Sequence, residues 1–475
     1  MLVFERYKGI IDDWPAFVDA CSAPLPACVW ANPERISPAH LADRFKKAGV
    51  AFEAIPWYPG AFRITHDQGL GNRFEYLAGL YAVQEEVAML PAFLLSPRPG
   101  ERVLDLCAAP GNKTAQMAFM MQNRGILIAN DVSNERMRAL RQTVNRLGLR
   151  NVAGTLRNAA SFPRQPFLFD KVIADVHCSC EGTSRKNPEV LHHARRNNLG
   201  GAQKAILQKA LQLCRVGGFV LYSTCTYAPE ENEMVVESAL NDLAPKIEGV
   251  IRPLRIPLRH SSGLHRWQTH RFRSDMQNTI RIYPHQNDTG GFFIALVEKV
   301  SESGAGYLAS GSTAPERKYK SVDEVALLTY VESRFGIPAG SFEDGRFFQV
   351  NGKTIALTSI PDSLIPVPFP RIIGLPFARA RMRYPKITTA ACLAFGRLAT
   401  RHVVELDRSQ TENFLRGRSV SAGFEQTRAL SHHGFVVVRH QGFCIGSADV
   451  ELLEREIKVM SLFPKAWRRD ALLKD

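Results

Sequence analysis

Residues 103–116 read VLDLCAAPGNKTAQ, and this stretch decides the fold. Its first four residues, 103–106, are typical of a short buried strand, and residues 107–113 form a small-residue turn. Residues 115–122, AQMAFMMQ, then have the composition of a helix. A strand that turns through small residues into a helix brings backbone amides and the positive helix end close to a ligand. The stretch therefore predicts a strand–turn–helix unit that binds a ligand.

Strands and helices continue to alternate on either side of this unit. Apolar runs predict further strands, and residues 136–148 and 199–214 have helical periodicity. The helices are expected to stop at Gly148 and at Gly217 and Gly218. The further strands are 126–131, 151–156, 171–176, 219–225 and 291–299. The pattern predicts the fold class: α/β, with a Rossmann-like doubly wound core.

Composition and length limit what kind of protein this is. The chain has 475 residues, 45% hydrophobic and 22% charged, which suits about three folded domains at roughly 150 residues each and excludes disordered and collagen-like chains. It has no apolar run of the roughly 18 residues that a membrane span requires. Its first residues carry charges inside any apolar core that a secretory signal would need. Nine cysteines without a disulfide framework fit a reducing compartment. We expect a cytoplasmic monomer without membrane contact.

The charge indicates a polyanionic partner. The net charge is +14, and basic surfaces of this size are typical of nucleic-acid binders. Residues 371–475 contain 18 basic and 10 acidic side chains. Residues 251–283 contain seven arginines and one acid, Asp275, with Trp267, Phe272 and Tyr283 among them. Arginines with interleaved aromatics suit unpaired RNA, whose bases stack; a solvated basic loop is the alternative.

Three groups of reactive side chains lie at predicted strand ends, where open α/β sheets bind ligands. Asp131 follows Gly111 by twenty residues, a spacing typical of an acid that binds ribose hydroxyls, and the turn lacks the glycine pattern of a dinucleotide site. Cys178 and Cys180 follow one strand and Cys225 follows the next. Each cysteine alone could be a buried, inert side chain. A thiolate beside a nucleoside site could instead attack an electron-poor ring.

A zinc site is the rival interpretation of the segment around Cys178. His177 and Cys180 stand beside it, but this spacing is poor for tetrahedral zinc, and the sequence has no second pair of closely spaced cysteines. We therefore expect no metal.

At these motifs the chain resembles the RNA 5-methylcytosine methyltransferases of the Nol1/Nop2/Sun family. The resemblance rests on VLDLCAAPGNKTAQ, IAND, DVHCSCEGT, YSTCTYAPEENE and RIYPHQNDTGGFFIALVEK. Residues 79–95 are similar to the helix that leads into the family's cofactor domain. Residues 371–475 resemble, more weakly, the PUA-like module of the bacterial members that act on small-subunit ribosomal RNA.

The resemblance implies roles for particular residues. Cys225 matches the nucleophile that attacks carbon 6 of cytosine, Cys178 the cysteine that helps to release the product, and Asp175 the acid between cofactor and base. The cofactor is S-adenosyl-L-methionine, bound by the loop, the ribose-binding acid, the residue near the adenine and Asp175. By position these residues are Cys107, Ala108, Ala109, Pro110, Gly111, Asn112, Lys113, Asp131, Asn158 and Asp175.

Four residues depart from the family pattern. Asn112 stands at a loop glycine and therefore requires a turn that tolerates a β-carbon. Asn158 stands where the family has an aspartate, and His177 replaces a proline. Cys180 replaces a glycine or another small residue.

The resemblance and the boundary signals together predict the domains. Residues 301–320 are rich in Gly, Ser and Ala, and residues 361–370 contain four prolines, so both segments suit boundaries. Residues 322–336 predict a helix, residues 346–359 predict a hairpin that turns at Asn351-Gly352, and residues 434–448 predict a second hairpin. The predicted parts are an RNA-binding extension (1–78), the methyltransferase domain (79–300), a linker (301–320), a small connecting domain (321–370) and a PUA-like RNA-binding domain (371–475) in an α+β region.

The expected activity is methylation of cytosine carbon 5 in RNA. Ribosomal RNA is the favoured substrate and transfer RNA is the alternative, because the same core serves both in the family. The alternative from another class is a non-catalytic RNA-binding assembly factor, which the four departures suggest.

Overall fold

The computed structural model describes residues 2–65, 69–193, 199–303, 320–350, 352–380 and 385–468. Most of the predicted linker lies outside these residues, as does Asn351 of the predicted hairpin turn. None of the described helices is long and apolar enough to cross a membrane.

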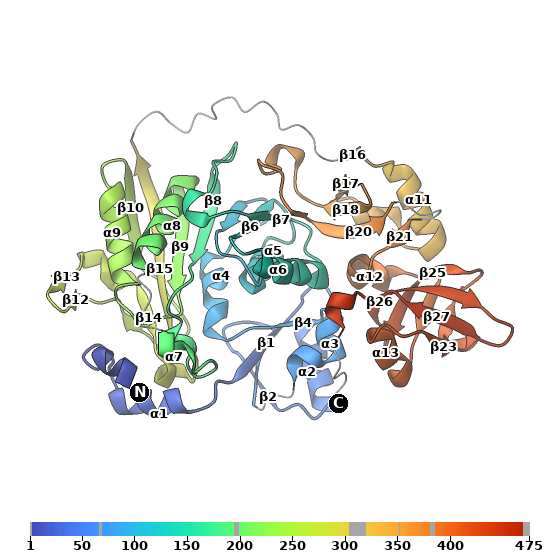
Figure 1. Cartoon of the computed structure of the whole chain (residues 1–475), viewed down its shortest axis with the longest axis horizontal. Helices are drawn as coiled ribbons and strands as arrows, with labels where there is room; N and C mark the ends of the chain where they lie inside the picture. The colour runs from blue at the N-terminus through green and yellow to red at the C-terminus, as the bar shows by residue number, and fades with distance from the viewer. Residues whose placement is uncertain are drawn as a thin grey trace.

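A large central sheet forms the middle of the molecule (Figure 1). Its strands run in the order β11-β14-β15-β9-β8-β5-β6-β7-β19, with β10 beside β15. Strand β10 is Ile247–Arg252, and β11 is Ser261–Ser262. The five strands from β9 to β7 are parallel to one another, and β15 joins β9 antiparallel. The central strands are β5 (Arg102–Asp105), β6 (Ile126–Asp131), β7 (Val152–Leu156), β8 (Phe169–Asp175), β9 (Cys214–Thr224), β14 (Ile280–Ile282) and β15 (Phe292–Glu302).

Helices cover both faces of this sheet. Neighbouring residues of a strand point to opposite faces, and Val103 and Leu104 accordingly belong to two different buried clusters. One cluster packs under α8 (Gly200–Leu213) and α9 (Glu233–Leu243), the other under α4 (Leu90–Leu95), α5 (Asn112–Met120) and α6 (Asn134–Leu147). The predicted doubly wound core is confirmed.

One predicted helix end is wrong. Helix α8 stops at Leu213, and Gly217 and Gly218 lie inside β9. The reason is close packing, because a β-carbon on Gly218 would stand 2.7 Å from the carbonyl oxygen of Asp170 in the neighbouring strand. Gly218 therefore allows the two strands to approach, and neither glycine terminates the helix.

The N-terminal part is a small sheet with helices, in the order β2-β3-β1-β4. The segment 79–95, predicted as helical, begins instead as strand β4 (Tyr81–Val83), which pairs antiparallel with β1 (Ala27–Ala31). The boundary predicted between residues 78 and 79 therefore falls inside this sheet. The remaining elements are α1 (Trp14–Ser22), α2 (Pro38–Lys47), β2 (Phe52–Ala54), β3 (Ala61–Ile64) and α3 (Phe74–Leu77).

The boundary predicted at residue 370 also falls inside a folded unit. Strand β19 (Ile372–Ile373) pairs with β7 at the edge of the central sheet. The next strands complete a separate five-stranded sheet, in the order β16-β17-β18-β20-β21. Its elements are β16 (Lys320–Ser321), α11 (Glu324–Phe335), β17 (Arg346–Val350), β18 (Thr354–Thr358), β20 (Leu375–Arg379) and β21 (Lys386–Ile387). Helix α11 and the hairpin of β17 and β18 agree with the prediction.

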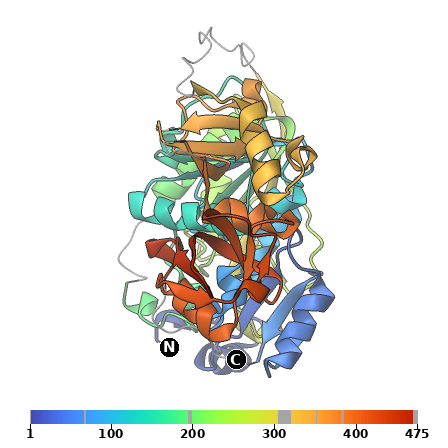
Figure 2. The ribbon, with the colours of Figure 1, turned by 90° about the vertical axis from the view of Figure 1, so that its right-hand side faces the viewer.

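The last sheet has six strands, in the order β23-β27-β26-β25-β22-β24. The predicted hairpin of β25 (Gly434–His440) and β26 (Phe443–Leu452) is confirmed. This sheet lies beside the N-terminal part (Figures 1 and 2), and one buried cluster joins Val29, Leu41 and Phe45 to Val404, Phe414 and Val438. The other elements are α12 (Thr389–Phe395), β22 (Val403–Glu405), α13 (Arg408–Leu415), β23 (Val420–Ala422), β24 (Thr427–Arg428) and β27 (Ile457–Ser461).

Candidate active site

The chemistry-bearing side chains gather at the carboxyl edge of the parallel strands. Asp105, Asp131 and Asp175 are the last residues of β5, β6 and β8, and Cys225 directly follows β9. Because these strands are parallel, their ends meet at one edge of the sheet, where open α/β sheets bind ligands.

Three thiols meet at this edge. The Sγ atom of Cys178 lies 3.4 Å from that of Cys225 and 3.9 Å from that of Cys180. Cys178 is buried, whereas Cys180 and Cys225 are partly exposed. The structure thus brings the predicted nucleophile and the predicted release cysteine together and adds Cys180 to them.

Hydrogen bonds tie the two cysteine-bearing loops together. The backbone amide of Gly182 donates to the carbonyl of Cys225 at 2.8 Å, and the hydroxyls of Ser179 and Thr226 lie 2.7 Å apart. Glu231 accepts the amide of Ser179 at 3.0 Å. Gly182 also packs on Gly291, whose carbonyl oxygen would stand 2.3 Å from an added β-carbon. Little freedom is left for the thiols to separate.

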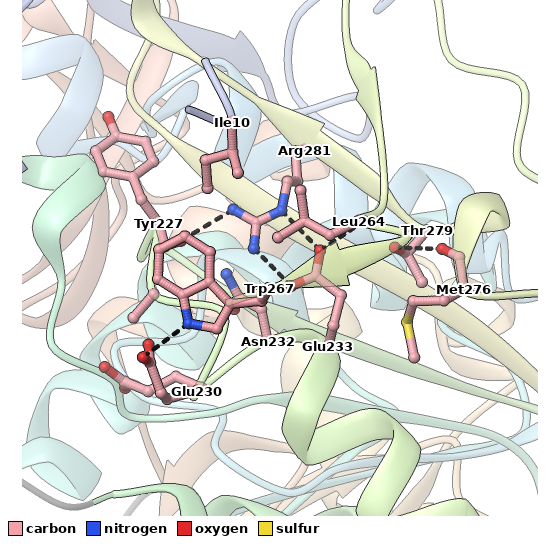
Figure 3. A network of polar contacts seen from close by, with 12 residues as sticks. Ile10, Tyr227, Glu230, Asn232, Glu233, Leu264, Trp267, Met276, Thr279 and Arg281 are labelled. Carbon is pink, nitrogen blue, oxygen red and sulfur yellow. Dashed lines mark hydrogen bonds and ion pairs between the residues drawn. The ribbon is translucent and has the colours of Figure 1, made fainter. Parts of the chain in front are cut away.

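A buried ion pair supports the segment after Cys225 (Figure 3). Arg281, on β14, donates from Nε to Glu233 at the start of α9 at 2.7 Å, and from a terminal nitrogen to the carbonyl of Tyr227 at 2.9 Å. The exposed fractions of the two charged side chains are only 2% and 0%. Sequence reasoning did not assign Glu233 a role, although it stands in the motif YSTCTYAPEENE.

Lys113 and Asp175 form a second ion pair beside the thiols. Lys113 Nζ lies 2.8 Å from one oxygen of Asp175, and the hydroxyl of Ser223 donates to the other at 2.7 Å. Burial alone would lower the pKa of Lys113, but Asp175 outweighs it and raises that pKa, and Cys225 acts in the same direction. Lys113 therefore keeps its positive charge close to Cys225.

The contacts among the thiols decide which one ionises first. The hydrogen bond from Cys178, and then that from Cys225, lowers the pKa of Cys180 to about 3. The contact with Cys178 would lower the pKa of Cys225, but Cys180 and burial raise it above its ordinary value. Cys225 therefore depends on nearby positive charge to ionise.

A cavity of 480 Å³ opens beside the loop of residues 107–113. Its walls include Glu85, Asp105, Lys113 and Asp175, together with Cys107 to Pro110 and Asn112. This volume suits a small-molecule cofactor. The three carboxyl groups suit a ligand that carries a positive sulfonium, so the residues fit S-adenosylmethionine.

Asp105 is a cavity residue that sequence reasoning missed. It accepts a hydrogen bond from the hydroxyl of Thr114 at 2.8 Å, and burial raises its pKa to about 7. The sequence did contain a pattern that could have identified Asp105, because an acid stands at the end of the apolar strand predicted at residues 103–106.

Three predicted cofactor residues do not line this cavity: Gly111, Asp131 and Asn158. Asp131 is buried, and its carboxylate accepts the backbone amides of Ala109 at 3.3 Å and Ser133 at 2.9 Å. Asn158 accepts the amide of Ala160 at 3.0 Å and thereby caps a short helical turn. Both side chains hold backbone next to the site.

The other three residues that depart from the family pattern lie in different surroundings. Gly111 takes the left-handed conformation, with φ at 105°, so Asn112 begins α5 normally and the expected β-carbon problem does not arise. The side chain of Asn112 donates to the carbonyl of Val83 at 2.9 Å. His177 is exposed. Cys180 itself has a left-handed backbone, with φ at 58°, which glycine would adopt more easily.

The predicted aromatic stacking surface at residues 251–283 is wrong. Trp267 and Tyr283 are buried together with Tyr7 and Phe17, and Phe272 packs on the same cluster. Arg281, Arg252 and Arg273 are held by ion pairs with Glu233, Glu298 and Asp275. The remaining arginines of this segment are exposed: Arg255, Arg259, Arg266 and Arg271.

Comparison with known proteins identifies the family. Residues 92–298 match the family described as 16S rRNA methyltransferase RsmB/F, and residues 4–86 match the N-terminal domain of 16S rRNA methyltransferase RsmF. The ribosomal RNA small subunit methyltransferase F of Shewanella piezotolerans is 30% identical over 90% of this chain and 89% of its own length.

Two archaeal proteins resemble a smaller part of the chain. The tRNA (cytosine(49)-C(5))-methyltransferase of Pyrococcus abyssi is 37% identical over 55% of this chain and 83% of its own length. The crystal structure of a methyltransferase homologue from Pyrococcus horikoshii is 32% identical, with a TM-score of 0.52, and covers 60% of this chain and 90% of that one. These matches confirm the resemblance that the motifs indicated, and the chain belongs to the RsmB/F family of 16S rRNA methyltransferases.

Proposed function

We propose that this protein methylates carbon 5 of cytosine in small-subunit ribosomal RNA, with S-adenosylmethionine as its cofactor. The observation that carries the proposal is the pair of thiols, Cys225 and Cys178, 3.4 Å apart beside the Lys113–Asp175 ion pair and the cofactor-sized cavity. The family match supports the same reaction class.

The reaction needs a nucleophile because carbon 5 of cytosine is too electron-poor to take a methyl group directly. A bond forms between Cys225 Sγ and carbon 6 while N3 takes up a proton, and carbon 5 becomes nucleophilic. S-adenosylmethionine, when bound, supplies the methyl group. Carbon 5 then loses its proton to solvent, and the bond between Sγ and carbon 6 breaks with its electron pair leaving as the Cys225 thiolate. N3 gives up the proton that it had taken, which yields neutral 5-methylcytosine.

The neighbouring side chains have distinct parts in this scheme. Lys113 keeps positive charge near Cys225 and so favours its thiolate. Asp175 orients Lys113 and, through its other oxygen, holds Ser223 one residue from the end of β9. Cys178, in contact with Cys225, assists product release. The target base must leave its helix, because stacking hides carbon 6.

Ribosomal RNA is favoured over transfer RNA by the extent of the two matches. The ribosomal RNA methyltransferase from Shewanella aligns over 90% of this chain, including the C-terminal sheets, whereas the transfer RNA enzyme aligns over 55%. Transfer RNA is kept as a second candidate because that enzyme is 37% identical over the 272 residues that it matches.

We assign the parts outside the core to RNA docking. Support comes from the excess of basic residues in 371–475 and from the separate family match of residues 4–86. The C-terminal region is proposed as PUA-like, and the enzyme as a monomer of the cytoplasm, a setting that suits its nine free cysteines.

The test uses a Cys178→Ala variant. If Cys178 helps to break the bond to carbon 6, this variant accumulates an RNA–protein adduct on a denaturing gel, and the Cys178→Ala/Cys225→Ala double variant does not. An adduct that persists in the double variant, or full turnover by the single variant without one, contradicts the assigned roles.

The substrate is tested in cells. Bisulfite sequencing of total RNA with and without the gene should show the loss of one methylated cytosine in small-subunit ribosomal RNA. Loss from transfer RNA alone would select the second candidate. No loss, together with no S-adenosylmethionine binding by titration calorimetry, would favour the non-catalytic assembly factor.

A further inference from the structure

The three thiols at the active site are close enough to share one ion. The Sγ atoms of Cys178, Cys180 and Cys225 all lie within 4.8 Å of one another, and Cys178 stands 3.4 and 3.9 Å from the other two. Three sulfurs on one tetrahedral zinc ion, each bonded at about 2.3 Å, stand about 3.8 Å apart. Small side-chain rotations therefore suffice to bring all three into bonding distance.

By sequence spacing, residues 177–180 are a poor zinc site, and the sequence has no second pair of closely spaced cysteines. The third sulfur comes from Cys225, 45 residues beyond Cys180 in the chain. The parallel pairing of β8 and β9 places the two loops side by side, and the bond from Gly182 to the carbonyl of Cys225 fixes them there. The cluster is thus assembled by the fold before any ion arrives.

Cys180 adds a third sulfur to the predicted catalytic pair of Cys178 and Cys225. Its backbone is left-handed, with φ at 58°, a conformation that a side chain makes unfavourable and glycine does not. A strained non-glycine residue at a functional site points to a role for its side chain. Here that side chain aims its Sγ at the other two thiols.

We propose that Cys178, Cys180 and Cys225 bind one thiophilic metal ion of the zinc class, with solvent in the fourth position. Each thiol that binds loses its proton to solvent, and three sulfur–metal bonds form. The ion occupies the Sγ of Cys225, so it blocks methyl transfer until a chelator removes it. This inhibition rests on the proposed function, whereas the binding does not.

Binding is measured first with Cd²⁺ as the probe, under a phosphine reductant that keeps the thiols reduced. The wild-type protein should bind one Cd²⁺ per chain, with thiolate-to-metal ultraviolet absorption that Zn²⁺ competes away. Cys180→Gly should weaken Cd²⁺ binding by more than about 100-fold. Losing a group that only hydrogen-bonds to a metal ligand costs less than this. Glycine suits the left-handed backbone, so circular dichroism and thermal stability should stay as in the wild type.

The matched control is Cys21→Ser, which removes a partly buried free thiol outside the cluster and should bind Cd²⁺ as the wild type does. Equal affinity in Cys180→Gly and wild type, or no Cd²⁺ absorption in the wild type, overturns the metal site.

Activity is the second readout. Zn²⁺ should inhibit the wild-type enzyme reversibly, and Cys180→Gly should need more than about 100-fold more Zn²⁺ for the same fractional inhibition. A wild-type protein that binds Cd²⁺ at the cluster but never methylates RNA would refute the proposed function and leave the metal site standing. An enzyme that methylates RNA but whose Cd²⁺ binding does not depend on Cys180 would refute the metal site and leave the proposed function standing.

Discussion

The core and the C-terminal region use positive charge in different ways. In the core, Arg281 lies buried against Glu233, and Lys113 lies partly buried against Asp175. In the C-terminal region, Arg401, Arg418 and Arg428 are exposed, while Arg439 is buried and donates to backbone carbonyls of the segment 396–399.

The difference separates positioning from binding. A buried pair fixes the geometry of its neighbours, because removing one partner leaves a charge without solvation. An exposed arginine adds little to stability but attracts a polyanion in a salt-dependent way. The core charges therefore hold the thiols in place, and the C-terminal charges are available to RNA.

The largest expected effect comes from the nucleophile itself. Cys225→Ala should lower the methylation rate by more than about 10³-fold, because covalent catalysis has no substitute group. Cofactor affinity, measured by titration calorimetry, should stay within a few-fold, since Cys225 is outside the cavity wall. Methylation at a tenth of the wild-type rate would assign the nucleophile to another thiol, with Cys180 the first to test.

Breaking the buried pair of the core should cost stability. Arg281→Met should lower the free energy of unfolding by about 3–5 kcal/mol, as loss of one partner of a buried pair does. Urea denaturation measures it, and the double variant Arg281→Met/Glu233→Leu should recover much of the loss. The matched control is Arg252→Met, whose pair with Glu298 is partly exposed and should contribute less than about 1 kcal/mol. Equal losses at both positions would contradict the comparison.

Asp105 should make stability depend on pH. Burial raises its pKa from 3.8 to about 7, so the folded state keeps a proton that the unfolded state releases between about pH 4 and 7. Stability should fall as pH rises through this window, by on the order of 4 kcal/mol. Asp105→Asn should remove this fall in urea denaturation across pH, and Asp19→Asn, at an exposed position, should not. If the stability of Asp105→Asn depends on pH as that of the wild type does, a group other than Asp105 is responsible.

The sequence predicts the core well because its signals are local. Apolar runs such as 126–131 and turns such as 107–111 mark strand ends directly, and parallel strands bring those ends to one edge. The positions of Cys178 and Cys225 follow from that rule. The role of Cys180 does not, because its contact with the other thiols depends on a left-handed backbone that no local pattern shows.

The periphery depends on contacts far apart in the chain. Ile372 and Ile373 join the central sheet next to β7, more than 200 residues earlier, and Phe414 shares a buried cluster with Val29. Proline-rich segments such as 361–370 suggest a boundary, but they cannot show that the chain returns to an earlier sheet. The burial of Trp267 and Tyr283 was missed for the same reason.

These contacts determine how RNA docking should be tested. Deleting residues 371–475 would remove β19 from the central sheet and expose the cluster that packs on the N-terminal part. A fall in RNA affinity in such a truncated protein would not distinguish docking from unfolding. Substitution of exposed side chains avoids this.

The smallest effect is expected from the exposed C-terminal charges. The triple variant Arg401→Gln/Arg418→Gln/Arg428→Gln should bind RNA less tightly, and removing each phosphate-binding side chain should reduce the salt slope of log K by about 0.7 for single strands or about 0.9 for duplex. Thermal stability and cofactor affinity should stay unchanged, because these side chains are exposed. The matched control neutralises exposed Arg98, Arg138 and Lys246 outside this region. If the control variant lowers the salt slope as much as the C-terminal triple variant does, positive charge anywhere on the surface attracts RNA equally. The assignment of the C-terminal region to RNA docking then fails.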